Sequence, residues 1–180
     1  MGKRWMGAAA RALRGAFAAA RGAGPRTGRL VARDLDDAAL LRAFESGALE
    51  PSAFHHLDHV RVAWLYVKHE PPLTALARFA DALRRFAAAA GKPGLYHETI
   101  TWAFLLLIRE RIERSGGAST FAEFVGQNPD VLAWRPSVLD QYYREETLRS
   151  ELARRVFVLP DRGSEPVIAP PPAAAPPAKQ

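Results

Sequence analysis

The apolar residues in the middle of the chain follow a helical spacing. Hydrophobic side chains recur at intervals of three or four within the segments 34–47, 51–68, 73–91 and 96–114, a spacing that places them along one face of a helix. Capping signals agree with these bounds, since acidic residues open the first segment, Pro51 suits a first helical turn, and glycines close the first, third and fourth. The pattern therefore predicts four main helices.

The C-terminal third of the chain predicts shorter elements. Helical segments are expected at 120–126, 129–134 and 137–155, followed by an extended segment at 156–160. Alternating strand patterns are few, and no repeat with a period between about 20 and 50 residues is present. The sequence therefore predicts an all-α fold, a compact helical bundle in which the very apolar helix at 96–114 takes a central position.

The two ends of the chain differ from the middle in composition. Residues 163–180 contain six prolines and predict a disordered Pro/Ala-rich tail. Residues 1–33 can wind into a basic amphipathic helix, with apolar side chains on one side and arginines on the other, or can form a mobile arm. We therefore divide the chain into an N-terminal arm (1–33), one helical domain (34–162) and a C-terminal tail (163–180).

Charge is distributed unevenly between these parts. The net charge of the chain is +6, yet residues 34–162 carry sixteen Lys/Arg against eighteen Asp/Glu. Residues 1–33 carry eight Lys/Arg and no acidic residue. Because the folded part has no excess of positive charge, we expect no nucleic-acid partner. The basic arm is instead expected to contact a membrane surface or a protein partner.

Cysteines and long apolar runs are both missing from the sequence. The absence of cysteine excludes disulfides, thiolate metal ligands and cysteine nucleophiles. No run approaches the roughly 20 apolar residues of a membrane-spanning helix. We therefore expect a soluble, cytoplasmic protein that can attach peripherally to a membrane.

Four of the five histidines fall within two of the predicted helices. His55 and His56 precede His59 by four and three residues in the second helix, and side chains at that spacing project from one face within reach of a single ion. His97 lies at the start of the fourth helix. If these helices are neighbours, His56, His59 and His97 converge as metal ligands, with His55 as a further candidate.

Carboxylates and polar side chains beside the histidines are candidates for the chemistry. Glu98 is expected to act as a ligand or a general base, and Asp58 to orient an imidazole or to complete the ligand set. Tyr96, Arg61, Tyr142 and Tyr143 are the polar groups expected to line a pocket. Histidine and carboxylate ligands without thiolates suit iron or zinc, with manganese or copper as alternatives.

Known sequence motifs exclude several activities. The pair His97-Glu98 resembles the first two positions of the zincin metalloprotease motif, but Thr101 stands where that motif has its second histidine, so this protease class is excluded. We expect Thr99 and Thr101 to bond their own helix backbone. There is no Gly-rich phosphate loop, nucleophile-elbow serine motif or Rossmann fingerprint, so nucleotide-dependent and serine-hydrolase chemistry have no sequence support.

Three functional hypotheses are compatible with these observations. The first is a helical-bundle metalloprotein, a metal-dependent enzyme with redox or hydrolytic chemistry on a small organic substrate. The second is a non-catalytic interaction module that docks through residues 1–33 and uses its histidines for structure. The third is a metal-free enzyme in which His97 and Glu98 form a general acid–base pair. The reaction, the substrate, the metal and the oligomeric state stay open at this point.

Overall fold

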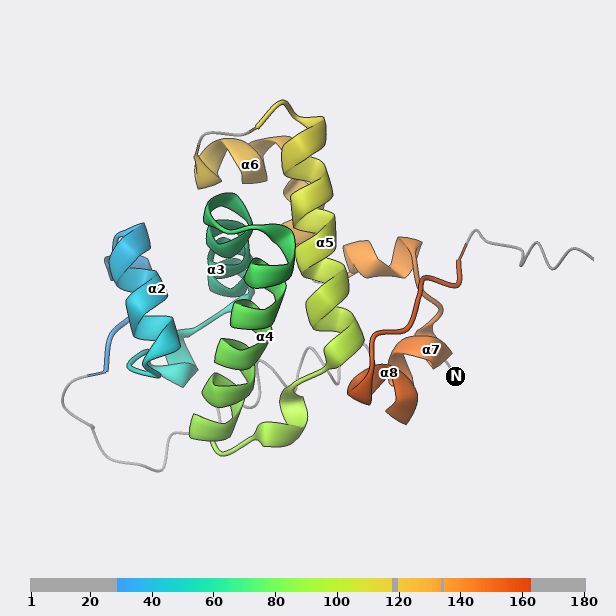
Figure 1. The fold of residues 1–180 in the computed structure, drawn as a ribbon, viewed down its shortest axis with the longest axis horizontal. Helices are drawn as coiled ribbons and strands as arrows, with labels where there is room; N and C mark the ends of the chain where they lie inside the picture. The colour runs from blue at the N-terminus through green and yellow to red at the C-terminus, as the bar shows by residue number, and fades with distance from the viewer. Residues whose placement is uncertain (1–28, 118–119, 134, 163–180) are drawn as a thin grey trace, which may run out of the picture.

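The computed structural model describes residues 29–117, 120–133 and 135–162, and these ranges are built of helices joined by loops (Figure 1). The α-helices are α2 (Asp37–Glu45), α3 (His56–His69), α4 (Pro72–Ala89), α5 (Glu98–Arg114), α6 (Phe121–Gln127), α7 (Glu145–Arg149) and α8 (Glu151–Arg155). The short 3-10 helices are η1 (Ala32–Asp34), η2 (Pro51–Ala53), η3 (Pro93–Leu95), η4 (Pro129–Leu132) and η5 (Val138–Gln141). The predicted all-α fold is confirmed. The predicted tail and residues 1–28 of the predicted arm lie outside the described residues.

The main hydrophobic core lies between α2, α3, α4 and α5. Helix α3 is the most deeply buried of these, because every side chain from Val62 to Val67 is shielded from solvent. The ring of Phe44 lies 5.6 Å from that of Phe54, 6.2 Å from that of Phe79 and 5.6 Å from that of Phe86, measured between centroids. These rings join α2, α4 and the turn before α3 through burial of large apolar surfaces.

A smaller hydrophobic core lies on the other side of α5. Leu107 enters it from α5, and Val138, Leu139, Tyr143 and Leu148 enter it from the C-terminal segments. Figure 1 shows α7 and α8 on the side of α5 that faces away from α2. Helix α5 therefore lies between two cores, as its apolar sequence leads one to expect.

The helix predicted at 51–68 is interrupted near its start. Pro51 begins the 3-10 helix η2, the backbone is extended at Phe54 and His55, and α3 begins only at His56. The side chain of Asp58 accepts a hydrogen bond from the His55 N–H at 2.8 Å, an arrangement typical of a helix N-terminus. The predicted bound at residue 51 is therefore wrong, because this local cap starts the helix later.

The helix predicted at 137–155 is divided into η5, α7 and α8. Ser150 is extended and separates α7 from α8, and its hydroxyl accepts a hydrogen bond from the Ala153 N–H at 3.1 Å. Serine side chains offer the backbone an alternative to the helical hydrogen bond. The prediction of one continuous helix is wrong, because apolar periodicity does not report such breaks.

The chain contacts the domain before Asp34, where the sequence places the domain boundary. Leu30 forms an isolated parallel bridge with Leu49: the Leu30 N–H donates to the Ala48 carbonyl at 2.9 Å. Ala32 is buried in the main core. Residues 29–33, which the sequence assigns to the arm, therefore pack against the domain.

The last described residues, 156–162, form a segment that we call the strap, and the sequence predicts an extended chain over most of it. The hydroxyl of Thr99 on α5 donates to the Val156 carbonyl at 2.8 Å and accepts from the Val158 N–H at 3.0 Å. The expectation that Thr99 bonds its own helix is therefore wrong. A buried threonine side chain on α5 instead holds a segment almost sixty residues later in the chain.

Aromatic and acidic side chains hold the strap at further points. The ring of Phe157 stacks on that of Trp102, with 5.3 Å between centroids. The side chain of Asp161 accepts hydrogen bonds from the Arg144 N–H at 2.8 Å and from the Thr147 hydroxyl. The strap thus ties α5 and α7 together.

Candidate functional site

The first candidate residues lie where α3 begins. His55 is exposed and is the N-cap residue of α3, while Asp58 is buried and uses its carboxylate to bond the His55 N–H. The ring of His56 turns toward the C-terminal half of the chain, and its Nε2 lies 2.9 Å from the Val131 carbonyl oxygen. Because a carbonyl only accepts, Nε2 must carry the proton and donate it. The edge of the same ring meets Phe104 on α5, 5.7 Å away between centroids.

His59 lies one turn farther along α3, against the aromatic cluster of the main core. Its ring meets the edge of Phe54 with 4.4 Å between centroids, and its Nε2 is shielded from solvent. Burial, together with the neighbouring rings of His56 and His55, lowers the pKa of His59 to about 3. The three histidines of α3 are therefore close enough to influence one another, and His59 is neutral at physiological pH.

His97 is the N-cap of α5 and is 5% exposed. Its Nδ1 accepts a hydrogen bond from the Ile100 N–H at 3.2 Å, and its Nε2 donates to the Leu148 carbonyl at 2.9 Å. Only the neutral tautomer with the proton on Nε2 makes both bonds. Burial lowers the pKa of His97, and the positive charge of Arg154 lowers it further, against the opposing effect of the bond to Leu148. Both ring nitrogens of His97 are thus used by the backbone.

Glu98 and Tyr96 form a small polar cluster with Arg84 of α4, a residue that the sequence reasoning missed. The Arg84 guanidinium lies 2.7 Å from the Glu98 carboxylate and 4.5 Å from the centroid of the Tyr96 ring. Burial raises the pKa of the Tyr96 hydroxyl, and the nearby negative charge of Glu98 adds to this effect. Arg84 precedes Glu98 by fourteen residues, so no local spacing signals their contact.

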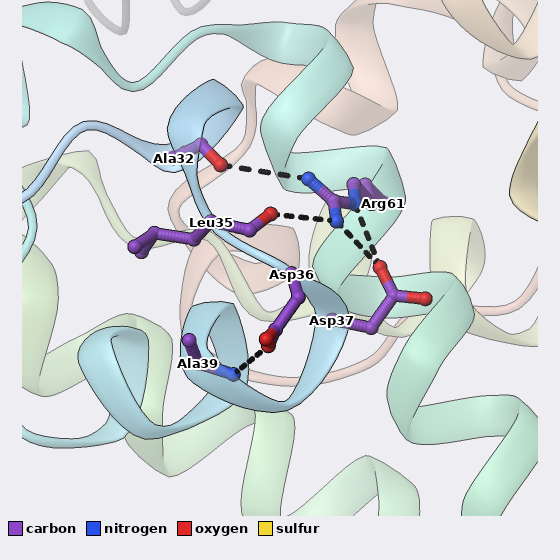
Figure 2. A network of polar contacts seen from close by, with 6 residues as sticks. All are labelled: Ala32, Leu35, Asp36, Asp37, Ala39 and Arg61. Carbon is purple, nitrogen blue, oxygen red and sulfur yellow. Dashed lines mark hydrogen bonds and ion pairs between the residues drawn. The ribbon is translucent and has the colours of Figure 1, made fainter.

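Arg61 lies at a different place, between α3 and the start of α2 (Figure 2). Its guanidinium donates to the Asp37 carboxylate at 2.6 Å and to the Leu35 carbonyl at 3.0 Å, and it reaches the Ala32 carbonyl at 3.5 Å. Arg61 is partly buried and its contacts are all to η1, α2 and the turn between them. It therefore fastens the beginning of the domain to α3 and does not join the histidines.

The sequence predicts that His56, His59 and His97 converge, and the structure agrees with this prediction in one respect only. Helices α3 and α5 are neighbours, and the structure brings His55, His56 and His59 together. His97, however, faces Leu148 and the charges of α8. Within residues 29–117, 120–133 and 135–162, no group of three or more His, Asp or Glu side chains is placed to hold a metal ion.

A hollow on the surface lies apart from all of these residues. It is found between the end of α3, the start of α4 and the middle of α5, and it is lined by Val67, Pro72, Ala75, Leu105, Leu106 and Arg109. Its walls are apolar and contain none of the predicted site residues. In the part of the chain that the structure describes, no helix is both long and apolar enough to cross a bilayer.

No protein-family model matches the chain, and no curated protein or solved structure is significantly similar to it. The function must therefore be argued from the chemistry of the chain's own residues.

Proposed function

We propose that the chain is a non-catalytic interaction module whose histidines stabilise the fold and whose basic residues 1–33 attach it to an anionic membrane surface. One observation carries the structural half of the proposal: the Nε2 atoms of His56 and His97 each donate to a main-chain carbonyl, from Val131 and Leu148 respectively. A nitrogen that holds a proton for a carbonyl has no lone pair for a metal ion. His56 and His97 thus each join two segments that lie far apart in the sequence.

The distribution of charge supports the choice of a membrane surface. Residues 1–33 carry eight Lys/Arg and no acid, whereas residues 34–162 carry slightly more acidic than basic residues. Trp5, Leu13 and Phe17 share one side of a helical projection of this segment, and arginines occupy the other. Such segments bind anionic lipids through electrostatic attraction and burial of the apolar side.

Co-sedimentation with vesicles tests this proposal. The full chain is expected to pellet with vesicles containing about one third phosphatidylserine, to stay in solution with phosphatidylcholine alone, and to be released by salt. Replacing Arg4, Arg11, Arg14 and Arg21 together by glutamine is expected to abolish pelleting. A matched variant loses the same charge from the exposed arginines of the domain, Arg42, Arg85, Arg135 and Arg144, and is expected to pellet normally. Equal pelleting of the two variants contradicts a role for the arm.

A metal-dependent enzyme acting on a small organic substrate is the second candidate. The observation in its favour is the proximity of His55, His56 and His59 at one end of α3, which are imidazoles of the kind that bind iron or zinc. Elemental analysis of the purified chain, before and after incubation with Fe²⁺ or Zn²⁺, tests it. About one equivalent of metal that is lost in His59→Leu favours this candidate, and less than about one tenth of an equivalent contradicts it.

A further inference from the structure

His97 lies where α5 meets the smaller hydrophobic core. Its Nδ1 accepts a hydrogen bond from the Ile100 N–H at 3.2 Å, and its Nε2 donates one to the Leu148 carbonyl at 2.9 Å. Ile100 and Leu148 also contribute their side chains to the smaller core. One ring therefore holds together two residues of the same core, one on α5 and one on α7.

This position accepts only a neutral ring. Protonation places a hydrogen on Nδ1, the atom that accepts from the Ile100 N–H, so two donors would face each other. His97 is 5% exposed, so water cannot readily replace the lost acceptor. A charged ring can regain contact with solvent only if the C-terminal segment that carries Leu148 moves away from α5.

The charged groups that face the ring come from α8. Burial is the main cause of the lowered pKa of His97, and the positive charge of Arg154 acts in the same direction. The bond to the α7 carbonyl and the negative charge of Glu151 oppose this lowering. The acid next to His97 in the chain, Glu98, pairs with Arg84 on α4 at 2.7 Å instead. The ring in the closed structure therefore stays neutral at pH values somewhat below its ordinary pKa of 6.5.

The other links described between α5 and the C-terminal segment do not titrate near neutral pH. The Thr99 hydroxyl holds the strap, and the ring of Phe157 stacks on that of Trp102. The hydrogen bond from Thr147 holds the pKa of Asp161 below its ordinary value of 3.8. His97 is thus the link that a moderate fall in pH affects first.

Opening of the smaller core gives the ring access to a proton. This core attaches the C-terminal segment through few buried residues, and such regions open at lower free energy than the rest of a domain. Because the exposed ring binds a proton more readily than the buried one, acid favours the open state. The opening constant then rises up to about tenfold for each pH unit below 6.5, until the ring of the closed state titrates as well.

The two hydrogen bonds of His97 require one neutral tautomer, and its ring lies at the contact between α5 and the C-terminal segment. From these two observations, we propose that His97 is an acid-operated latch, which releases residues 137–162 from α5 while the larger core stays folded. The open state exposes the Leu107 side chain of α5, which the closed state buries. This latch goes beyond the membrane attachment proposed above and does not depend on it.

Hydrogen exchange of the full chain between about pH 7 and pH 5, corrected for the intrinsic exchange rate at each pH, tests the latch. This window lies above the ordinary pKa values of carboxylates. The reporter amides are those of Tyr143 and Val158, which bond Leu139 and Thr99. Their protection factors are expected to fall up to about tenfold for each pH unit below 6.5. The amide of Leu65, in the larger core, is expected to stay more protected than both at every pH.

Replacing the two buried histidines separates the latch from the larger core. His97→Asn can still accept from the Ile100 N–H but does not titrate, so protection of the reporter amides is expected to depend much less on pH. His59→Leu is the matched control, because it removes a buried histidine of the larger core. It is expected to leave the pH dependence of the reporter amides unchanged. Circular dichroism at pH 7 checks that both variants keep their helices.

A second pair of variants changes the pKa of the latch and leaves its ring in place. Arg154→Gln removes the positive charge that opposes protonation of His97, so the closed ring titrates at a higher pH. The fall in protection is therefore expected to level off at a higher pH than in the wild type. Arg155→Gln, at the next position of α8, is the control and is expected to behave like the wild type.

Protection of the reporter amides that stays constant from about pH 7 to pH 5 overturns the proposal. The same pH dependence in the wild type and in His97→Asn overturns it too, because another group then takes up the proton. A third contrary result is equal protection of Leu65 and the reporter amides at every pH, since the chain then opens as one unit.

Discussion

At the scale of single residues, histidine acts here as a side chain with two different hydrogen-bonding atoms. A neutral imidazole donates from one ring nitrogen and accepts at the other. His97 uses this difference to cap α5 at Ile100 and to hold Leu148 at the same time, and His56 reaches Val131 in a similar way. Burial lowers the pKa of both His59 and His97, so these two rings stay neutral at physiological pH.

Replacing His97 tests its double role. His97→Ala removes the cap of α5 and leaves the Leu148 carbonyl without its donor, so the free energy of unfolding is expected to fall by about 2 kcal/mol. His97→Asn can still accept from the Ile100 N–H and is expected to recover roughly half of this loss. Urea unfolding followed by circular dichroism measures both. Equal destabilisation by the two substitutions would show that capping contributes little.

Acid is expected to destabilise the protein through its histidines. The pKa of His59 is about 3 in the folded chain against 6.5 in the unfolded chain, and the pKa of His97 is also lowered. A lowered folded pKa contributes stability that is complete above the unfolded value and is lost as the pH falls through the window between the two. The expected loss from His59 alone is roughly 1.4 kcal/mol per pH unit below about pH 6.5.

Unfolding midpoints in urea, measured between about pH 7 and pH 4, reveal this slope. In His59→Leu the titrating group is absent, so the stability is expected to change less steeply with pH. A wild-type protein as stable at about pH 4 as at pH 7 is incompatible with a buried neutral His59.

At the scale of elements, caps and side chains from distant segments decide where the helices begin and end. The cap formed by Asp58 places the start of α3 at His56. Ser150 separates α7 from α8 within a segment whose apolar spacing predicts one helix. Arg61 joins α2 to α3, and Thr99 joins α5 to the strap. Each of these bonds satisfies main-chain or charged groups that would otherwise be left without partners as the helices pack.

The link between α5 and the strap is expected to depend on the Thr99 hydroxyl. Thr99→Val keeps the shape of the side chain but removes the group that bonds both Val156 and Val158, so a loss of about 1 to 3 kcal/mol is expected. The amide proton of Val158 is expected to exchange with solvent much faster in this variant. Thr74→Val, on the exposed side of α4, is the control. Unchanged exchange at Val158 in Thr99→Val would mean that other contacts hold the strap.

At the scale of the whole molecule, α5 separates two hydrophobic cores of unequal size. The larger core gathers the side chains of α2 to α5, and the smaller one attaches the C-terminal segments through few buried residues. A region with few buried apolar contacts opens at lower free energy than the rest of a domain. We therefore expect the segment 137–162 to open before α3 and α4 do.

Hydrogen exchange with two core variants tests this order. Leu107→Ala removes a side chain that is 6% exposed in the smaller core and is expected to cost about 2 to 5 kcal/mol, with increased exchange confined mainly to 137–162. Leu65→Ala in the larger core is expected to increase exchange throughout the described chain. The same pattern in both variants would indicate one cooperative unit instead of two.

Much of the fold could be predicted because helical periodicity is a local property. Side chains three or four residues apart predict the all-α class, the positions of α4 and α5, and the central part of α3. Periodicity also placed His56, His59 and His97 on helices that prove to be neighbours. It could not assign their partners, because His56 bonds a carbonyl 75 residues away and His97 one 51 residues away.

Which segments become helices, and which faces they bury, follow from the amino-acid sequence alone, since both depend on the spacing of apolar residues within a few turns. The direction in which each imidazole points is set by tertiary packing instead. The direction of each ring depends on which carbonyls of η4 and α7 have no partner within their own helix. It also depends on how the packing of α3 and α5 brings these carbonyls near His56 and His97. The same packing placed Arg84 beside Glu98 and the strap along Thr99, contacts between segments too far apart for any local pattern to report.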